Sequence, residues 1–547
     1  MKAKILNANI ASLFLILSIV LLFASCSSDY LDDEEFKIFR YNESAGISTL
    51  DPAFAKDLPH IWACNQLFNG LVTLDDQLKV IPAIAKDWTI DSTGTIYTFF
   101  LRDDVFFHRS DAFEEGTRTV VAADFLYSFN RILSPGLSSP GTWIFNQVAQ
   151  HQGQYGFKAL NDTTFQIELS SPFPAFLGVL AMTYASVIPK EAIEYYGPDF
   201  RNHPIGTGPF HFQYWKEGVK LVFRRNDNYF ETDNGNRLPY LDAVSISFLI
   251  DRQTAFMEFI KESLDFMSGI DSRYKDELLT RDGQLRQKYA DKISLIRQPY
   301  LNTEYIGIFI NSKKSDSSAN PLHHKKLRQA INYAIDRDRM LRFLRNGIGK
   351  PGLSGMIPYG MPGYDTSAII GYHYNPQKAR LLLAEVGIKR PQITVTTTAD
   401  YVDIIKFVQS QLNEVGFDAR VEVSPAATMR EMRAQGRLPM FRASWVADYP
   451  DAENYLSLFY GPNLSPAGPN YTHFSHNTFD SLYLSAMSET DDQKRFSLYH
   501  QMDRMVMEES PVVVLYYDEV LRFVNKRING LGGNPVNMLD LKRVRID

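Results

Sequence analysis

The sequence predicts an α/β protein, and three observations support this fold class. The chain has 547 residues, of which 45% are hydrophobic and 22% are charged, a composition typical of a globular protein rather than a disordered or fibrous one. Segments that alternate polar and apolar residues, as strands do, are interspersed with segments of helical periodicity. No period of 20–50 residues repeats, which argues against a solenoid or a propeller. At about 150 residues per domain, the length fits three or four core-sized units or two large lobes.

The first 25 residues have the pattern of a secretory signal peptide. Two lysines precede an apolar run over residues 10–23, and small residues then lead to Cys26. The run is shorter than the roughly 20 residues that a membrane-spanning helix needs. The cysteine directly after Ala-Ser resembles a bacterial lipobox, in which the thiol is lipidated and becomes the mature N-terminus; the alternative is a plain signal peptide followed by an ordinary cysteine. Residues 26–35 are then an acidic tether between the lipid and the fold.

The body of the chain supplies strands first and then helices and strands in alternation. Alternating apolar residues predict strands over residues 95–101, 162–169, 219–225 and 243–250. Helical spacing of apolar residues predicts helices over residues 325–342, 376–386 and 401–415. β-Branched stretches predict strands over residues 393–398 and 419–423. The strand–helix–strand order of these last segments implies an α/β lobe from about residue 393 to residue 445.

Charge and cysteine content exclude several classes of protein. The formal net charge is −6, from 57 basic and 63 acidic residues, and no basic stripe is present, so a nucleic acid is not an expected partner. The chain has two cysteines, which cannot form a disulfide scaffold. We expect Cys64 to be a small buried apolar residue. Beyond the signal peptide, no segment approaches the length of a membrane-spanning helix.

The sequence carries no recognisable catalytic or metal-binding motif. His-Glu-x-x-His, Gly-x-Ser-x-Gly and the phosphate-binding Gly-x-x-x-x-Gly-Lys-Ser/Thr are all absent. His323 and His324 are adjacent, and adjacent residues of a helix do not share a face, so we interpret them as a solvated helix start. His60 and Cys64 have the spacing of a nucleophile–base pair on a helix but lack an evident third group to orient them. We therefore expect neither an enzyme nor a bound metal or cofactor.

Several short segments, taken together with their order and spacing, identify a family. They are residues 50–52, 66–71, 81–88, 97–108, 123–128, 204–210 and 443–450. In this combination the chain resembles the family-5 extracellular solute-binding proteins, the peptide-binding receptors of ABC importers. The similarity extends from about residue 36 to the C-terminus. The lipobox fits this resemblance, because such receptors are often tethered near their permease.

The resemblance implies a two-lobed clamp of the periplasmic-binding-protein type, class II, in the large form with an inserted extra subdomain. Ligand binds between the lobes, and closure about a hinge buries it. One lobe is expected to be discontinuous and to comprise residues 36–75, 203–299 and 511–547. Its inserted subdomain is expected at residues 76–202. The other lobe is expected at residues 300–510.

The chemistry of peptide capture singles out Asp448. A receptor for varied sequences must hold the constant parts of a peptide, which are its α-amino group and its backbone. A buried ammonium group needs a carboxylate partner, since an unpaired buried charge is costly. In the peptide receptors, the acidic residue of the matching segment pairs with the α-amino group of the ligand, and the spacing Trp445-x-x-Asp448 is kept here. The alternative is that Asp448 caps a local turn before Pro450, alongside Asp451.

The same resemblance implies further ligand contacts on both lobes. They are Ser444 and Val446 as main-chain partners, Trp445 and Arg442 in side-chain pockets, Lys56 and Leu58 as backbone contacts on the opposite lobe, and Tyr305 and Tyr516. For the two tyrosines the alternative is a place in the hydrophobic core, where aromatic residues of such segments usually lie.

The sequence departs from the dipeptide-selective members of the family at one position. Those relatives place an arginine, which grips the ligand carboxylate, near the start of the helix that corresponds to residues 401–415. The segment here, residues 398–403, has no arginine and is locally acidic. A fixed two-residue ligand is therefore disfavoured, and longer peptides are favoured.

The resemblance also supplies the expected partners and location. We expect a monomer in the cell envelope, on the periplasmic side, anchored to a membrane by lipid on Cys26, that delivers oligopeptides to ABC permease subunits. The alternative within the same fold is a non-peptide solute, such as an oligosaccharide or a metal chelate. A sugar site would use stacked aromatic rings and neutral polar groups and would have less need of a carboxylate at position 448.

Overall fold

The computed structural model describes residues 36–269, 274–310, 320–369 and 371–547. The predictions for the signal peptide, for Cys26 and for the acidic tether lie outside the described residues. By its contacts the chain separates into two units, residues 1–37 and residues 38–547. All strands and helices of the described residues belong to the second unit.

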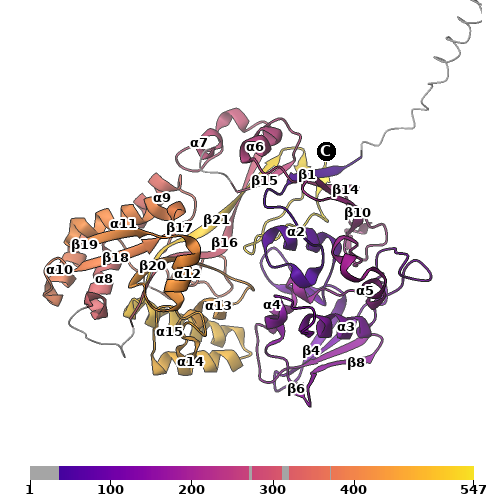
Figure 1. The fold of residues 1–547 in the computed structure, drawn as a ribbon, viewed down its shortest axis with the longest axis horizontal. Coiled ribbons are helices and arrows are strands. Elements are labelled where there is room, and N and C mark those ends of the chain that lie inside the picture. The colour runs from indigo at the N-terminus through magenta and orange to yellow at the C-terminus, as the bar shows by residue number, and fades with distance from the viewer. Residues whose placement is uncertain (1–35, 270–273, 311–319, 370) are drawn as a thin grey trace, which may run out of the picture. The chain divides into compact units, whose positions relative to one another are not determined.

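An 11-stranded mixed sheet runs through the second unit (Figure 1). In spatial order its strands are β10 (Phe210–Lys216), β11 (Lys220–Arg225), β14 (Ala243–Ser247), β1 (Ile38–Asn42), β15 (Phe266–Ser268), β21 (Val512–Asn525), β16 (Ile293–Ile308), β20 (Met440–Val446), β18 (Gln392–Thr397) and β19 (Asp418–Val423). β17 (Lys350–Pro351) pairs with β21 off this path. β1 and β14 are parallel, as are β18, β19 and β20, whereas every pair that involves β16 or β21 is antiparallel.

The long strands β16 and β21 join the two ends of this sheet. They pair along most of their length, with a shift of register between Pro299 and Thr303 of β16. On one side of the shift β21 is bordered by β15, and on the other side β16 is bordered by β20. The same two strands therefore serve two different groups of neighbours.

The buried apolar residues form distinct cores on the two sides of that shift. One core gathers residues from the first 266 positions with residues near the C-terminus, and two further cores gather residues mainly from positions 300–510. A fourth, smaller core gathers residues from positions 256–293 with Ile348, Leu521 and Phe523. The first half of β21, residues 512–517, packs in these latter cores, whereas Val524 packs in the first. Two residues reach across: Tyr449 packs in the first core, and Leu78 packs in one of the others. The predicted division at residue 510 thus falls before the point at which β21 changes neighbours.

A separate four-stranded antiparallel sheet lies within residues 76–202, where the inserted subdomain is predicted. Its order is β4 (Ala85–Ile90), β5 (Ile96–Leu101), β9 (Thr164–Glu168) and β8 (Phe157–Asn161). Helix α3 (Ala122–Leu133) packs on this sheet through aromatic rings. The ring centroids of Phe129 and Phe157 are 5.4 Å apart, and those of Phe125 and Phe165 are 5.8 Å apart. The strands predicted at residues 95–101 and 162–169 are confirmed as β5 and β9, and those at 219–225 and 243–250 as β11 and β14.

The helix predicted over residues 325–342 is two helices, so this prediction is wrong in its extent. α8 (Lys325–Tyr333) ends and α9 (Arg337–Leu344) begins anew at Asp336, whose side chain accepts a hydrogen bond from the Arg339 N–H. The Asp336 N–H donates to the side chain of Gln411 at 2.8 Å, outside either helix. Apolar spacing continues through the break because Ala334 and Ile335 are buried in the same core as both helices, and a cap is not visible in that spacing.

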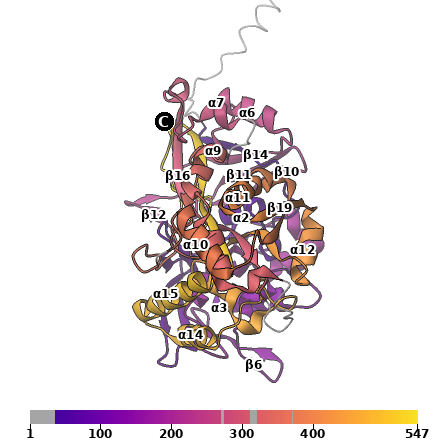
Figure 2. The same cartoon turned by 90° about the vertical axis from the view of Figure 1, so that its left-hand side faces the viewer.

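The predicted α/β lobe is confirmed element by element. Helix α10 (Pro376–Val386) ends at Gly387, with φ of 76°, and α11 (Val402–Val415) ends at Gly416, with φ of 117°. A left-handed residue after a helix is most easily a glycine. Figure 1 shows these helices beside β18 and β19, and in Figure 2 α11 again lies next to β19. The two strands begin within one residue of their predicted starts.

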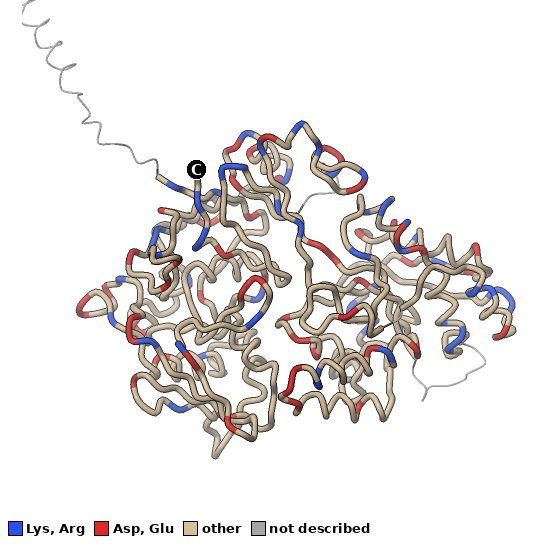
Figure 3. The backbone as a smooth tube through the Cα atoms, turned by 180° about the vertical axis from the view of Figure 1, so that it is seen from behind, with Lys and Arg blue, Asp and Glu red and all other residues tan. Residues whose placement is uncertain are grey.

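Short elements complete the described chain. The remaining strands are the pairs β2 (Val72–Leu74) and β3 (Val80–Pro82), β6 (Gln150–His151) and β7 (Gln154–Tyr155), β12 (Thr232–Asp233) and β13 (Asn236–Arg237), and β22 (Ile528–Asn529) and β23 (Arg545–Ile546). The remaining helices are α2 (Leu58–Leu67), α4 (Phe176–Leu180), α5 (Lys190–Tyr196), α6 (Arg252–Ile260), α7 (Lys275–Leu278), α12 (Ala426–Ala434), α13 (Glu453–Leu456), α14 (Asn477–Ser488) and α15 (Asp492–Glu509). Basic and acidic residues are interspersed along the backbone (Figure 3).

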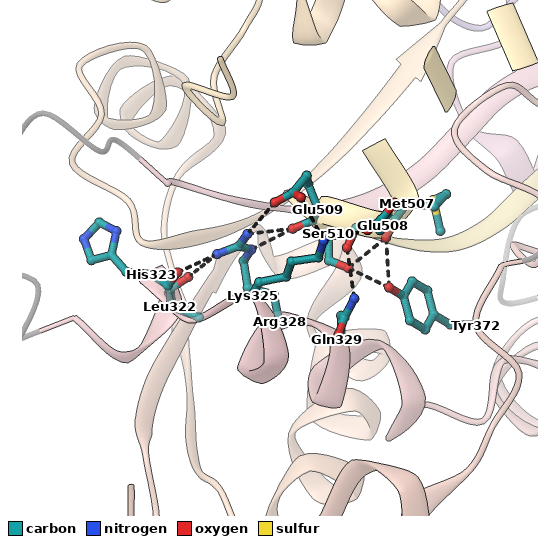
Figure 4. A network of polar contacts seen from close by, with 10 residues as sticks. All are labelled: Leu322, His323, Lys325, Arg328, Gln329, Tyr372, Met507, Glu508, Glu509 and Ser510. Atoms are coloured by element: carbon teal, nitrogen blue, oxygen red, sulfur yellow. Dashed lines mark hydrogen bonds and ion pairs between the residues drawn. The ribbon is translucent and has the colours of Figure 1, made fainter. Parts of the chain in front are cut away.

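The start of β21 is fixed by a polar network between α8 and the end of α15 (Figure 4). Arg328 donates through Nε and Nη2 to the carbonyl oxygen of Glu509, at 3.0 and 2.6 Å, so a buried guanidinium satisfies a carbonyl at the end of the helix. Lys325 adds ion pairs to Glu508 and Glu509 at 2.9 and 2.8 Å. Ser510 then takes a left-handed conformation, with φ of 54°, and the chain turns into β21.

Candidate functional site

Strand β20 offers an open edge where the ligand's main chain is predicted to bind. One edge of β20 pairs with β16 along its whole length, from Met440 to Val446. On the other edge, β18 pairs with Met440 and Phe441 alone. From Arg442 to Val446 that edge has no strand partner among the described residues, and Val446 is 41% exposed. An unpaired edge presents a row of backbone donors and acceptors to which an extended peptide can add as a further strand.

Trp445 is held in place beside this edge by a neighbour on α13. Its indole Nε1 donates a hydrogen bond to Oδ1 of Asn454 at 2.7 Å. Asn454 is buried, and its side chain also hydrogen-bonds the carboxyl group of Asp448. One carboxamide therefore orients both the ring and the acid that the sequence singles out.

Asp448 lies on the loop after β20 with its side chain outward. Its neighbours Ala447 and Tyr449 are 7% and 8% exposed, because side chains of this loop point alternately inward and outward. Asp448 is therefore exposed at the surface, which corrects the expectation of a buried acid. Loss of hydration to the surrounding protein raises the pKa of its carboxyl group, and the hydrogen bond from Asn454 opposes this effect. No ion pair of Asp448 occurs within the described residues.

The turn before α13 is capped by Asp451 rather than by Asp448. Oδ1 of Asp451 accepts hydrogen bonds from the Glu453 N–H at 2.9 Å and from the Tyr499 hydroxyl at 2.7 Å. Arg495 pairs with the same carboxylate at 3.2 Å. The capping role considered for Asp448 is thus filled by its neighbour.

Tyr184 connects the Asp448 loop with the predicted inserted subdomain. Burial and the negative charges of Asp448 and Asp57 raise the pKa of Tyr184 to about 12, so both acids lie within electrostatic reach of its hydroxyl. The adjacent Tyr449 ring packs on Trp143 and Phe173, with centroids 6.3 and 6.4 Å apart. Segments that are about 270 positions apart in the sequence are thereby brought together at Asp448.

Lys56 and Leu58 flank Asp57, but they line different cavities. Lys56 is exposed and borders a cavity of about 770 Å³ together with Asp51 and Arg131, which form an ion pair at 2.6 Å. Leu58 borders a second cavity of about 480 Å³. Asp57 is the N-cap of α2 and contacts Nδ1 of His60.

The ring nitrogens of His60 hydrogen-bond to groups other than Cys64, so the nucleophile–base pair considered for this spacing is not formed. Nε2 of His60 accepts from the Ser48 N–H at 3.1 Å and lies 3.0 Å from the Ser48 hydroxyl. The ring therefore ties the Ser48 loop to α2. Cys64 is fully buried, as expected, and its thiol donates to the Leu50 carbonyl at 3.5 Å.

Arg442 and the two tyrosines belong to a buried polar cluster under β20 and β16. Arg442 pairs with Glu304 at 2.5 Å and lies over the ring of Tyr401. The hydroxyl of Tyr516, which is 1% exposed, accepts from Arg345 at 3.0 Å. Arg345 in turn pairs with Asp518 at 2.6 Å, so each guanidinium in the cluster is balanced by a carboxylate. Tyr305 is 4% exposed and packs in the core, on the same strand as Glu304.

Ser444, Trp445, Val446 and Asp448 thus lie on β20 and the loop that follows it, and Arg442, Tyr305 and Tyr516 lie in the polar cluster and core beside that strand. Lys56 and Leu58 border two other cavities. Sequence reasoning missed Asn454 and Tyr184. Asn454 follows Asp448 by six positions and could have been found as a short-range polar neighbour. Tyr184 carries no local signal, because only the fold brings it to Asp448.

Two further features of the described residues bear on function. They contain no group of three or more histidine, cysteine, aspartate or glutamate side chains arranged to hold a metal ion. Nor do they contain a helix whose length and apolar character would carry it across a bilayer.

Comparison with protein families finds one match that covers most of the chain. Residues 79–466 match the description "Bacterial extracellular solute-binding proteins, family 5 Middle". The chain is 26% identical over 501 residues to the dipeptide-binding protein of Escherichia coli (strain K12), covering 88% of this chain and 89% of that protein. It is 25% identical over 532 residues to the periplasmic oligopeptide-binding protein of Salmonella typhimurium, covering 92% of each.

Comparison with solved structures confirms the fold class. The structure of HbpA2 from Haemophilus parasuis superposes with a TM-score of 0.82, at 23% identity, over 93% of this chain and 100% of that one. At this identity the likeness establishes the fold, which is the two-lobed α/β binding-protein fold that the sequence predicts.

Proposed function

The chain belongs to family 5 of the bacterial extracellular solute-binding proteins, and we propose that it captures oligopeptides between two lobes and delivers them to an ABC permease. Proteins of this family bind solutes and are not enzymes. The two curated relatives named above are peptide-binding proteins, one of them periplasmic, which supports a peptide ligand and a place in the cell envelope. The lipobox-like cysteine at position 26 supports anchoring to a membrane by lipid.

The observation that carries the proposal is an unpaired carboxyl group beside an open strand edge. Asp448 has no ion pair among the described residues, and the edge of β20 from Arg442 to Val446 has no strand partner there. A peptide satisfies both needs at once, because its α-amino group pairs with the acid while its backbone pairs with the strand. A neutral sugar offers neither a cation nor a strand.

In this proposal the chain folds into two lobes that close on the peptide. One lobe comprises residues 36–75, 203–299 and 511–547, with residues 76–202 inserted in it, and the other comprises residues 300–510. The contacts of Tyr449 with Trp143 and Phe173 lie between these two parts and support an approach of the lobes at the amine end of the ligand.

The test is calorimetric titration with a free-amine pentapeptide and with its N-acetylated form. We expect Asp448→Asn to lower affinity for the free-amine peptide by roughly 2–5 kcal/mol, the effect of removing one partner of a charge pair that the bound peptide and the closed lobes bury. Acetylation should weaken binding to the wild type by a similar amount and should have no further effect on Asp448→Asn. The matched control is Asp365→Asn, an exposed aspartate within a loop, which should bind like the wild type.

Equal affinity of wild type and Asp448→Asn for the free-amine peptide would contradict amine capture. Mass spectrometry of ligands that copurify with the protein separates the remaining possibilities. A released oligosaccharide or metal chelate, in place of peptides, would contradict the peptide ligand itself.

A further inference from the structure

The cavity beside Leu58 has an aromatic interior. It measures about 480 Å³ and lies between the loop after β1, helix α2, helix α6 and strand β15. Trp62 and Phe266 form part of its wall, with ring centroids 6.0 Å apart. Phe256 and Tyr274 form another part, stacked 5.0 Å apart with 7° between their planes.

Glu43 borders this cavity and has no cationic partner among the described residues. Its carboxylate is half-buried and accepts a hydrogen bond from the Ala45 N–H at 3.1 Å, and no ion pair of Glu43 occurs in the described part of the chain. Loss of hydration raises the pKa of Glu43, with a further rise from Asp57 and opposing effects from the Ala45 hydrogen bond and from His60. An acid with lost hydration and no ion pair gains from a cation that enters beside it.

Among the described residues, the cavity also borders one cation, Arg252 of α6. This residue is exposed on the first turn of its helix, and it is not among the charged groups that shift the pKa of Glu43. No cation of the described chain therefore pairs with the charge of Glu43.

We propose that this cavity takes the side chain of a lysine or arginine of the bound peptide, with Glu43 as the partner of its charge. The inference rests on the proposed function and names a preference within it. The long apolar stem of such a side chain fits along aromatic walls, and its charged end is attracted both to ring faces and to a carboxylate. An apolar side chain would fill the walls but leave Glu43 unpaired.

The location of the cavity relative to Asp448 suits a residue further along the same peptide. Leu58, which borders the cavity, directly follows Asp57. The negative charges of Asp57 and Asp448 both raise the pKa of Tyr184, and the charge of Asp57 also raises the pKa of Glu43. Acidic groups thus extend from the amine site to the cavity, and the first positive charge of the peptide is matched at one end and the second at the other.

The experiment uses two series of free-amine pentapeptides built on pentaalanine, in which each position in turn carries lysine or its uncharged analogue norleucine. Affinities of the purified protein are measured by calorimetry. We expect one position beyond the first at which the lysine peptide binds about tenfold more tightly than the norleucine peptide, as for a half-buried ion pair aided by ring contacts. Glu43→Gln should abolish this difference and leave the norleucine peptides unaffected.

Two further variants serve as a charge control and as a test of the cavity. Glu115→Gln removes one charge from an exposed turn and should keep the lysine preference in full. Ala255→Trp, on the half-buried helix position that borders the cavity, should lower the affinity for the preferred lysine peptide and leave that for pentaalanine unchanged.

The outcomes distinguish this inference from the proposed function. If neutral peptides bind and the lysine preference is absent, or persists in Glu43→Gln, or is lost equally in Glu115→Gln, the role of the cavity is wrong while peptide binding stands. If no peptide of either series binds, peptide binding itself is wrong.

Discussion

Two groups of carboxylates in this molecule have opposite surroundings. Glu304 and Asp518, under β20 and β16, are each paired with an arginine at 2.5–2.6 Å. Asp448 and Glu43 have raised pKa values from lost hydration and no ion pair among the described residues. The first group is internally neutral and holds the strands that join the two ends of the sheet. The second has no matching charge among the described residues, which is why we propose that a ligand binds there.

The largest expected effect is on the paired group. Arg442→Ala leaves Glu304 buried without its cation, and we expect the free energy of unfolding to fall by roughly 3–5 kcal/mol, as when one partner of a buried pair is removed. Denaturant unfolding followed by circular dichroism measures it. Arg420→Ala, which breaks an exposed pair with Asp418 at 3.2 Å, is the control and should cost under about 1 kcal/mol. Similar losses for both variants would remove the contrast between the two groups.

An intermediate effect is expected from Asp503, a buried acid held by backbone N–H groups instead of by a cation. It accepts from the Met356 N–H at 2.8 Å and the Ile357 N–H at 3.3 Å, and burial raises its pKa from 3.8 to about 7. Between these values the folded state binds a proton that the unfolded state has lost, so the contribution of Asp503 to stability is greatest below about pH 4 and is lost as the pH rises to about 7.

The slope for this one group is at most about 1.4 kcal/mol per pH unit. Unfolding free energies measured from pH 4 to pH 7 should therefore show a decline that is weaker in Asp503→Asn, whose side chain does not titrate. An identical slope in the wild type and in this variant would show that Asp503 is ionised in the fold throughout the range.

The smallest expected effect is on the stability of the unpaired group. Asp448→Asn and Glu43→Gln remove charges that have no partner within the described chain, so at neutral pH and without peptide we expect changes within about 0.5 kcal/mol of the wild type, or a slight gain. Thermal unfolding without peptide measures this. A loss of several kcal/mol in either variant would place that acid with Glu304 as a structural group, and its effect on binding would then need another explanation.

Much of the fold was predictable because local patterns dictate it. Alternation in β5, β9 and β11 and the glycines that end α10 and α11 are properties of short segments, and all are found where the sequence places them. The break between α8 and α9 was not predictable, because the buried Ala334 and Ile335 continue the apolar spacing through it. Predicted site residues on β20 and its loop are brought together for the same local reason, whereas Tyr305 and Tyr516 lie in the core.

By itself the sequence determined the family, the α/β order of the elements, and Asp448 as the acid to examine, since each is written in a contiguous run of residues. Only the tertiary structure decided which charges are matched. Whether a carboxylate pairs with an arginine, as Glu304 pairs with Arg442, or lies without a cation near a tyrosine hydroxyl, as Asp448 does near Tyr184, depends on contacts between residues more than 100 positions apart. Electrostatic pairing acts through space over a few ångströms, and spacing along the chain does not encode it.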